Sequence, residues 1–372
     1  VGQVLGYLGL HRHEVESASG GDIVAITGLG DLKISDTICD PAKPEALPPL
    51  VVDEPTVTMT FQVNTSPFAG REGKFVTSRN IWERLQNECR HNVALRVEGT
   101  IDSDKFTVSG RGELHLSVLI EEMRREGYEL AVSRPQVILK HVNGQTLEPY
   151  ELLDVDVKEE NQGSVMDALG QRHAEMRNMV PDGKGRVRLD FYIPSRGLIG
   201  FQNEFMNLTS GTGIMCHTFE KYDKFLGGDI GRRKNGVLIS NATGKALGYA
   251  LWYLQDRGYL FIGHATEVYE GEIIGVHNRE NDLTVNCLKG KKLTNVRASG
   301  TDDAIVLVPP VIFSLEQALE FINDDELVEV TPKSIRLRKK ELTEMDRIRA
   351  FRRNAAKEAA AVQASLEGNE DN

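Results

Sequence analysis

Several signals that would identify a site or a compartment are missing from this sequence. Its 372 residues contain no run near the ~18 apolar residues of a membrane span, so we expect no membrane partner. Its four cysteines, at 39, 89, 216 and 287, form no Cys-x-x-Cys pair. That spacing fits neither a zinc site nor a dense disulfide framework. We therefore expect buried free thiols in a reducing, cytoplasmic environment.

An excess of positive charge is also missing. The chain has 44 Lys and Arg against 55 Asp and Glu, for a net charge of −11. A protein that coats nucleic acid is basic, so any RNA contact must come from local patches on an acidic body. The hydrophobic fraction of 40% and the charged fraction of 27% are typical of a globular protein with packed cores.

No complete nucleotide-binding motif is present either. A phosphate-binding loop needs G-x-x-x-x-G-K-[ST], but Gly244-Lys245 is followed by Ala246. Gly110-Arg111-Gly112 resembles part of a dinucleotide fingerprint, but the third glycine is missing. We also find no catalytic triad that spacing alone would single out. These observations predict that the chain is not an enzyme and has no metal site and no cofactor of its own.

Residues 1–50 alternate short β patterns with turns such as Gly20-Gly21, which predicts antiparallel hairpins. The segment is too short for a closed barrel, so we interpret it as the remnant of a β-barrel domain. It begins as if inside a strand and has no signal peptide, so we expect a piece of a longer protein. Four prolines between 41 and 49 predict an extended linker.

Residues 51–140 predict a ferredoxin-like domain, because strands and helices follow the order βαββαβ. In the second helix, residues 113–126, we expect Leu114, Val118, Leu119 and Met123 on one buried stripe. Gly127 is the expected stop of that helix, and Ser78 is the expected cap of the first. The expected strands cover 57–63, 94–97, 106–108 and 130–132.

Residues 141–226 predict a second ferredoxin-like domain, with one strand left unassigned. Its first helix is expected over 162–178, with His173 and Met176 on the inner face, and its second over 198–208. Its expected strands cover 151–157, 187–191 and 215–219.

Residues 227–372 predict a mixed, β-rich C-terminal domain. The whole chain is therefore expected to be an α+β multidomain protein with a partial barrel and two ferredoxin-like domains. A helix is expected over 315–323, and a basic, alanine-rich terminal helix over 341–361. Strands are expected at 237–239, 248–251, 273–276, 304–308 and 335–338.

The candidate RNA-binding residues are Lys and Arg side chains in local clusters, because phosphates are met by such groups. One cluster lies in the polar stretch 277–303, which contains flexible glycines and which we expect to order on RNA. A second surrounds the turn at 182–185, and a third lies beyond 335. The third is equally explained by pairing with the acidic run at 316–329. The candidates are Arg279, Lys289, Lys291, Lys292 and Arg297; Arg177, Lys184, Arg186 and Arg196; and Arg336, Arg338, Lys339 and Lys340.

The stretch Ser109-Gly110-Arg111-Gly112-Glu113-Leu114-His115-Leu116 resembles a signature of domain III in the elongation factor G family. Residues 148–226, with Ile193-Pro194-Ser195-Arg196-Gly197, resemble domain V of that family. No domain IV stands between them, which sets the chain apart from elongation factor G itself. Segments such as Asn281-Asp282-Leu283-Thr284 and Gly290-Lys291-Lys292-Leu293 resemble the C-terminal domain of the BipA/TypA family rather than that of LepA.

This resemblance covers nearly the whole chain and implies a ribosome-binding translational GTPase. It implies roles in stress and cold adaptation, virulence regulation and 50S subunit assembly. The implied partners of this monomer are the 50S and 70S ribosome, 23S rRNA, the A-site tRNA and stalk-base proteins. The loop 277–303 is expected to reach toward the peptidyl-transferase centre and that tRNA. GTP and Mg²⁺ would belong to a G domain that is not in this chain.

Two other functions remain open on the residues alone. Tandem ferredoxin-like domains also bind small ligands at their interfaces, which would make the chain a regulatory protein. An enzyme with an unrecognised site would show a strongly perturbed carboxylate or His in a deep pocket.

Overall fold

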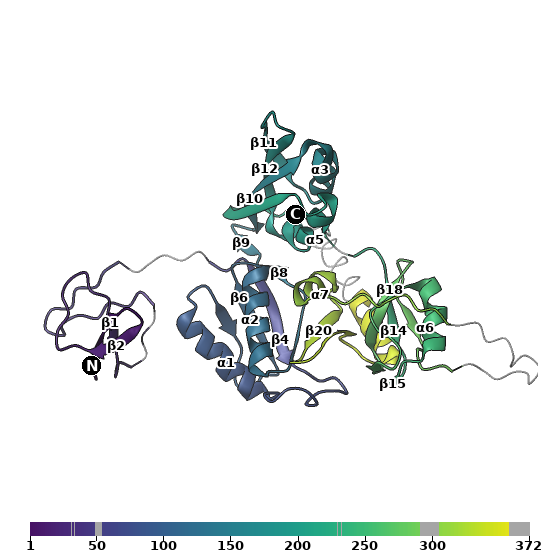
Figure 1. Cartoon of the computed structure of the whole chain (residues 1–372), viewed down its shortest axis with the longest axis horizontal. Coiled ribbons are helices and arrows are strands. Elements are labelled where there is room, and N and C mark those ends of the chain that lie inside the picture. The colour runs from purple at the N-terminus through teal and green to yellow at the C-terminus, as the bar shows by residue number, and fades with distance from the viewer. Residues whose placement is uncertain are drawn as a thin grey trace, which may run out of the picture.

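The structure is a computed structural model that describes all residues of the chain except Asp31, Lys33, 49–53, Asp229, Arg232, 291–304 and 357–372. The described residues form four sheets with interspersed short helices, so the α+β class expected from the sequence is confirmed (Figure 1). None of the described helices combines the length and the apolar content needed to cross a bilayer.

The N-terminal segment forms a small antiparallel sheet in the order β2-β1-β3, in line with the expected hairpins. Leu8, Leu10 and Ile23 of this segment are 76%, 98% and 84% exposed, so much of its apolar surface is uncovered. The strands are β1 (Val4–Leu8), β2 (His11–Glu14) and β3 (Ala25–Ile26).

The next unit has the order βαββαβ, and its strands lie in the sheet order β7-β4-β6-β5. Side chains of β4 alternate between buried and half-buried because the helices cover only one face of the sheet. The elements are β4 (Val57–Val63), α1 (Ser78–His91), β5 (Arg96–Glu98), β6 (Lys105–Gly110), α2 (Glu113–Glu126) and β7 (Leu130–Val132).

Two details of this unit differ from the sequence expectation. The cap of α1 is Thr77, whose side chain accepts the backbone N–H of Asn80, rather than Ser78. The expected stripe on α2 is also wrong in part, because Leu114 and Val118 are 66% and 55% exposed. The buried apolar positions of α2 are 116, 119, 120 and 123, so the buried stripe is rotated around the helix axis relative to the expected one. Gly127 does end α2, with a φ of 100°.

The second βαββαβ unit has a sheet of its own, in the order β11-β12-β10-β13, with β9 paired to β10. Its first helix is shorter than expected: it ends before Arg172, and His173 has a φ of 61°, which a continuing helix does not allow. Residues 175–181 form the missing strand, and the expected helix wrongly covered the first four of them. The elements are β8 (Gln136–Val137), which pairs with β4 of the first unit, then β9 (Lys140–Val142), β10 (Gln145–Lys158), η1 (Glu159–Asn161), α3 (Gln162–Gln171), β11 (Glu175–Pro181), β12 (Arg186–Pro194), α4 (Ser195–Leu198), α5 (Phe201–Leu208) and β13 (Ile214–Lys224).

The C-terminal region extends the sheet of the first βαββαβ unit into an 11-stranded sheet. Strand β20 pairs with β7, with Val328 opposite Val132, and one hydrophobic core runs across this junction. The predicted domain boundaries stay a prediction, and this sheet crosses them. The elements are β14 (Val237–Ser240), β15 (Gly244–Lys245), α6 (Gly248–Leu254), η2 (Gln255–Arg257), β16 (Gly258–Leu260), β17 (Glu267–Val268), β18 (Glu272–His277), β19 (Leu283–Val285), α7 (Leu315–Phe321), β20 (Glu326–Val330), β21 (Ile335–Lys339) and a helix that includes 344–356.

Two expected strands of this region are wrong. Residues 248–251 belong to the helix α6, because a short apolar run fits a buried helix as well as a strand. Residues 305–308 form no strand, and Val306 and Val308 are 73% and 68% exposed. The expected burial of all cysteines is also wrong, since Cys39 and Cys216 are exposed.

Candidate nucleic-acid interface

Three of the candidate cations extend into solvent. Lys184, Arg279 and Lys289 are exposed, and none has a side-chain partner among the residues that the structure describes. Lys184 lies in the β11–β12 turn, where the Asp182 carboxylate accepts its backbone N–H at 2.7 Å. Arg279 follows β18, and Lys289 follows β19. Such unpaired cations are the groups that phosphates meet first.

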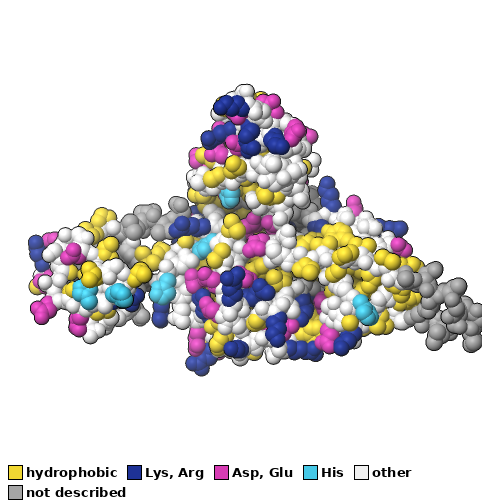
Figure 2. Space-filling model, viewed as in Figure 1, with side chains coloured by type: hydrophobic (Ala, Val, Ile, Leu, Met, Phe, Trp, Pro, Cys, Tyr) yellow, Lys and Arg dark blue, Asp and Glu magenta, His cyan; other side chains and the backbone are white. Residues whose placement is uncertain are grey.

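Two neighbours of Lys184 are partly engaged inside the second unit. Arg186 donates to the Asp156 carboxylate at 2.6 Å. Arg177 pairs with Glu175 at 3.2 Å and lies over the Tyr192 ring at 4.9 Å. Figure 2 shows Lys and Arg mixed with Asp and Glu over this unit, at the top of the view. Charges of both signs are therefore mixed over this surface, and Lys184 at the β11–β12 turn is exposed without a side-chain partner among the described residues.

The Arg196 guanidinium is bonded within the fold rather than extended into solvent. Its guanidinium donates to the fully buried Glu148 carboxylate at 2.6 Å and to the carbonyl of Gly227, also at 2.6 Å. The guanidinium also lies over the Phe225 ring at 4.7 Å. The sequence makes this side chain a candidate RNA contact, but in the fold it joins β10 to the segment that leaves the unit.

The basic cluster beyond 335 also points into the fold. Arg336 pairs with Glu72 at 2.8 Å and with Glu329 at 3.3 Å. Arg338 is 1% exposed and donates to the Thr65 hydroxyl at 3.1 Å. Lys340 remains exposed and donates to the Asp324 carbonyl. For Arg336 and Lys339, the pairing with the acidic run at 316–329 that the sequence left open is the one observed.

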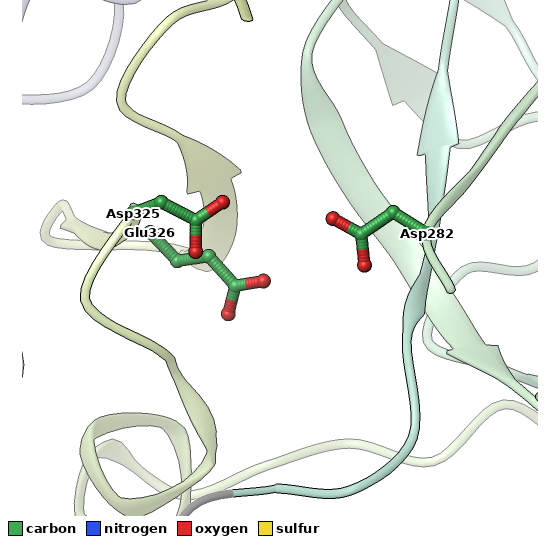
Figure 3. Close-up of side chains that lie close together, drawn as sticks. All are labelled: Asp282, Asp325 and Glu326. Carbon is green, nitrogen blue, oxygen red and sulfur yellow. The ribbon is translucent and has the colours of Figure 1, made fainter. Parts of the chain in front are cut away.

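The carboxylates of Asp282, Asp325 and Glu326 lie close together in the C-terminal region (Figure 3), and the Lys339 ammonium pairs with all three. This ammonium is 2.7 Å from Asp282, 2.7 Å from Asp325 and 2.9 Å from Glu326. Oxygens of these three acids lie within 4.8 Å of one another, a spacing that can hold a metal ion. The buried ammonium supplies the positive charge here, and these acids raise its pKa despite its desolvation.

Lys291, Lys292 and Arg297 lie outside the described residues, as does the whole of the loop 277–303 from 291 onward. The same holds for the last part of the expected terminal helix. The prediction that these cations bind RNA stays a prediction.

Sequence reasoning missed a polar junction between the two βαββαβ units and α7. Glu113, in the signature stretch, faces Glu320 of α7 and the pair formed by His217 and Glu151, whose Nδ1 and Oε2 are 2.5 Å apart. Burial, with Glu320 nearby, raises the pKa of Glu113 to about 7. The hydrogen bond to Glu151 raises the pKa of His217. No sequence spacing links these groups, which come from positions 113, 151, 217 and 320 of the chain.

Comparisons with known proteins cover most of the chain. The family model described as the TypA/BipA C-terminal domain matches residues 235–344, and that of the elongation factor G C-terminus matches 145–230. The chain is 70% identical over 352 residues to a large ribosomal subunit assembly factor BipA from Haemophilus influenzae. It is 68% identical over 352 residues to the protein of the same name from Escherichia coli (strain K12).

These alignments cover 95% of this chain but only 57% and 58% of those two relatives. The chain thus spans little more than half the length of the curated relatives it matches. A solved structure from Thermus thermophilus is similar over 60% of this chain and 49% of its own, at 15% identity. Its TM-score of 0.35 is too low to inform the fold.

Proposed function

Because the chain belongs to the TypA/BipA family, we propose that it is the ribosome-binding C-terminal portion of a translational GTPase that acts in assembly of the large ribosomal subunit. The observation that carries this proposal is the 70% identity over 95% of the chain to a protein named for that role. Roles in cold and stress adaptation and in virulence regulation belong to the same proposal. We propose that the protein acts in the cytoplasm, at the ribosome, as a monomer.

We assign GTP and Mg²⁺ to a part of the relatives that this chain does not cover. The residues present here do not fit a nucleotide. Gly244 and Lys245, the nearest match to a phosphate-binding loop, form the two-residue strand β15 and are not followed by a hydroxyl residue. In a P-loop, backbone amides at the start of a helix surround the phosphates. The proposed role of this chain is therefore binding, without catalysis.

We assign residues 51–140 and 141–226 to two ferredoxin-like domains and 227–372 to the C-terminal domain. Support comes from the two βαββαβ orders and from family models that match 145–230 and 235–344. Residues 1–50 are assigned to the end of a barrel domain.

We assign RNA contact to the exposed cations of the acidic body, above all Lys184, Arg279 and Lys289. Phosphate contacts need charges that reach solvent, and these side chains meet that condition. The partners would be 23S rRNA in 50S and 70S ribosomes, the stalk-base proteins and the A-site tRNA. Lys291, Lys292 and Arg297 extend the same assignment along the loop.

The test is co-sedimentation of the chain with purified ribosomes across a salt series. We compare it with a variant in which Lys289, Lys291 and Lys292 are changed to Ala. A matched variant changes three exposed lysines elsewhere, Lys43, Lys105 and Lys158, to Ala and so has the same net charge. Loss of binding and a shallower salt slope in the first variant alone supports loop contact with phosphates. Equal behaviour of the two variants would contradict it.

A further inference from the structure

An open cleft of about 1020 Å³ lies on the C-terminal domain, between α6 with η2 and the residues that follow β19. Helix α6 forms the outer side of that domain, at the right of Figure 1. Tyr249, Tyr253 and Arg257 line one side of the cleft, and Asn286 and Lys289 line the other. The sequence did not reveal it, because residues 248–251 were expected to form a strand.

The ring of Tyr253 is oriented by its neighbours but not covered by them. It packs edge-on against Tyr249, with centroids 5.0 Å apart, and against Trp252, with centroids 4.8 Å apart. Its hydroxyl is 3.1 Å from that of Tyr249. Even so, Tyr253 is 51% exposed and Trp252 is 42% exposed. A ring that is held in place and half exposed suits the stacking of another planar ring.

The polar groups of the cleft favour an anion. Lys289 and Arg257 are both exposed, and neither has an ion-pair partner within the described residues. Asn286 accepts the Leu288 backbone N–H at 2.9 Å through its side-chain oxygen, which leaves its NH₂ group to donate. Asp256 is the acid among the lining residues. Two cations and an amide donor beside an open aromatic ring match a phosphate next to a base.

We propose that this cleft binds one unpaired nucleotide of RNA, with its base stacked on Tyr253 and its phosphate held by Lys289 and Arg257. The nucleotide is unpaired because bases inside a duplex already stack on each other and cannot reach a protein ring. Stacking on Tyr253 tolerates any base, so recognition is of structure rather than of sequence. The inference rests on the proposed function, which supplies RNA as the partner, and adds a defined subsite to it.

The test measures fluorescence anisotropy of a labelled single-stranded hexaribonucleotide, and of the same strand in a duplex, with the whole chain. Tyr253→Ala is expected to weaken single-strand binding about tenfold and to leave duplex binding unchanged. Tyr253→Phe keeps the ring and is expected to bind as the parent does. Lys289→Ala is expected to weaken both. The matched control is Tyr259→Ala, a tyrosine that is 47% exposed and outside the cleft.

Two sources can present such a nucleotide: the 3′ end of an RNA and a bulge within a folded RNA. A 2-aminopurine placed at either position loses fluorescence when it stacks on an aromatic ring. Quenching at the 3′ end alone assigns the cleft to an RNA terminus, and quenching at a bulge alone assigns it to folded RNA.

Equal single-strand affinity of the parent, Tyr253→Ala and Tyr259→Ala, with unchanged melting temperatures, would overturn the cleft assignment. So would failure of the chain to bind any oligonucleotide. If the chain still sediments with ribosomes in either case, the proposed function stands and only this subsite falls. If ribosome binding is also absent, the proposed function falls with it.

Discussion

The two βαββαβ units have the same strand order, but the sheet edge formed by the last strand is covered in one unit and exposed in the other. In the first, the last strand β7 is wholly buried and pairs with β20 of the C-terminal region. In the second, the last strand β13 is mostly exposed and lies at an edge of the described sheet. An unpaired edge presents free backbone groups, which a protein must cover or use. The sheet of the first unit thus continues into the C-terminal region, whereas the sheet of the second unit ends at an exposed strand.

The polar groups of the two units follow the same division. At the junction of β4, β7 and β20, the buried Asn64 amide donates to Glu129 at 2.7 Å and to Glu329 at 3.1 Å. The Tyr269 hydroxyl also donates to Glu329, at 2.5 Å. Buried networks of this kind stabilise one arrangement when every member is satisfied. The second unit has one such buried pair, Arg196–Glu148, at its base. On its surface it has exposed pairs such as Arg188–Asp154, which contribute little.

The strongest test of this contrast is Lys339→Ala, at the junction that extends the first unit. Removal of the ammonium takes one cation away from the fully buried Glu326, which keeps the Arg233 guanidinium and the Asn323 backbone N–H as partners. It also takes the Lys339 partner from Asp282 and Asp325. Breaking such a buried pair costs about 3–5 kcal/mol. We expect a large drop in the urea midpoint, followed by tryptophan fluorescence. Lys340→Ala, at the exposed neighbour, is the control, and an equal effect of both variants would refute a structural role for Lys339.

A second test asks whether the units unfold separately. Leu189 of β12 and Leu130 of β7 are both fully buried, so either change to Ala costs about 3 kcal/mol. The two tryptophans, Trp82 and Trp252, lie outside the second unit. Leu130→Ala should therefore shift the fluorescence transition. Leu189→Ala should shift only part of the circular-dichroism transition and leave the fluorescence transition in place. If Leu189→Ala shifts the fluorescence transition as much as Leu130→Ala does, the two units unfold together.

Local features of the fold were predictable where one physical signal dominates. Helix α2 spans 113–126 and stops at Gly127, as predicted, although two positions of the expected apolar stripe are exposed. The α6 segment was mistaken for a strand because seven residues hold too few turns to show a period. The first four residues of β11 were assigned to the preceding helix because the strand's apolar residues, Met176, Met179 and Val180, are exposed and do not alternate with buried ones.

The candidate site was less predictable, because the partners of charged groups are set by tertiary structure. Arg336 and Glu72 are 264 positions apart, yet their atoms lie 2.8 Å apart. A cluster of bases looks the same in sequence whether it faces RNA or buried acids. Only the structure separates Lys339, which is enclosed by carboxylates, from Lys289, which is exposed.

A third test concerns pH at the junction between the two units. Burial raises the pKa of Glu113 from 4.5 to about 7, so the folded state favours the neutral carboxyl. The stability from this group is complete below pH 4.5 and is lost as pH rises toward 7. The His217 pKa is raised as well, so its contribution is present at low pH and falls as pH rises above its ordinary value of 6.5.

We therefore expect the melting temperature to fall between about pH 5 and pH 8. Glu113→Gln should reduce the fall of the melting temperature with pH below about pH 7. It should also stabilise the chain by about 2 kcal/mol at neutral pH. Glu122→Gln, on the exposed face of the same helix, is the matched control. A pH profile that is identical in the parent and in Glu113→Gln would exclude Glu113 as the titrating group.

The smallest expected effect on stability is at the exposed turn of the second unit, where the comparison predicts a surface role alone. Lys184→Ala removes a charge with no side-chain partner in the described structure, so the free energy of unfolding should change by less than about 0.5 kcal/mol. Ribosome affinity should fall roughly two- to threefold, and the salt slope should decrease by about one unit. Lys105→Ala, an exposed lysine of the first unit, should change neither. If Lys184→Ala destabilises the chain and leaves its affinity intact, the second unit is a structural element like the first, and the contrast between them fails.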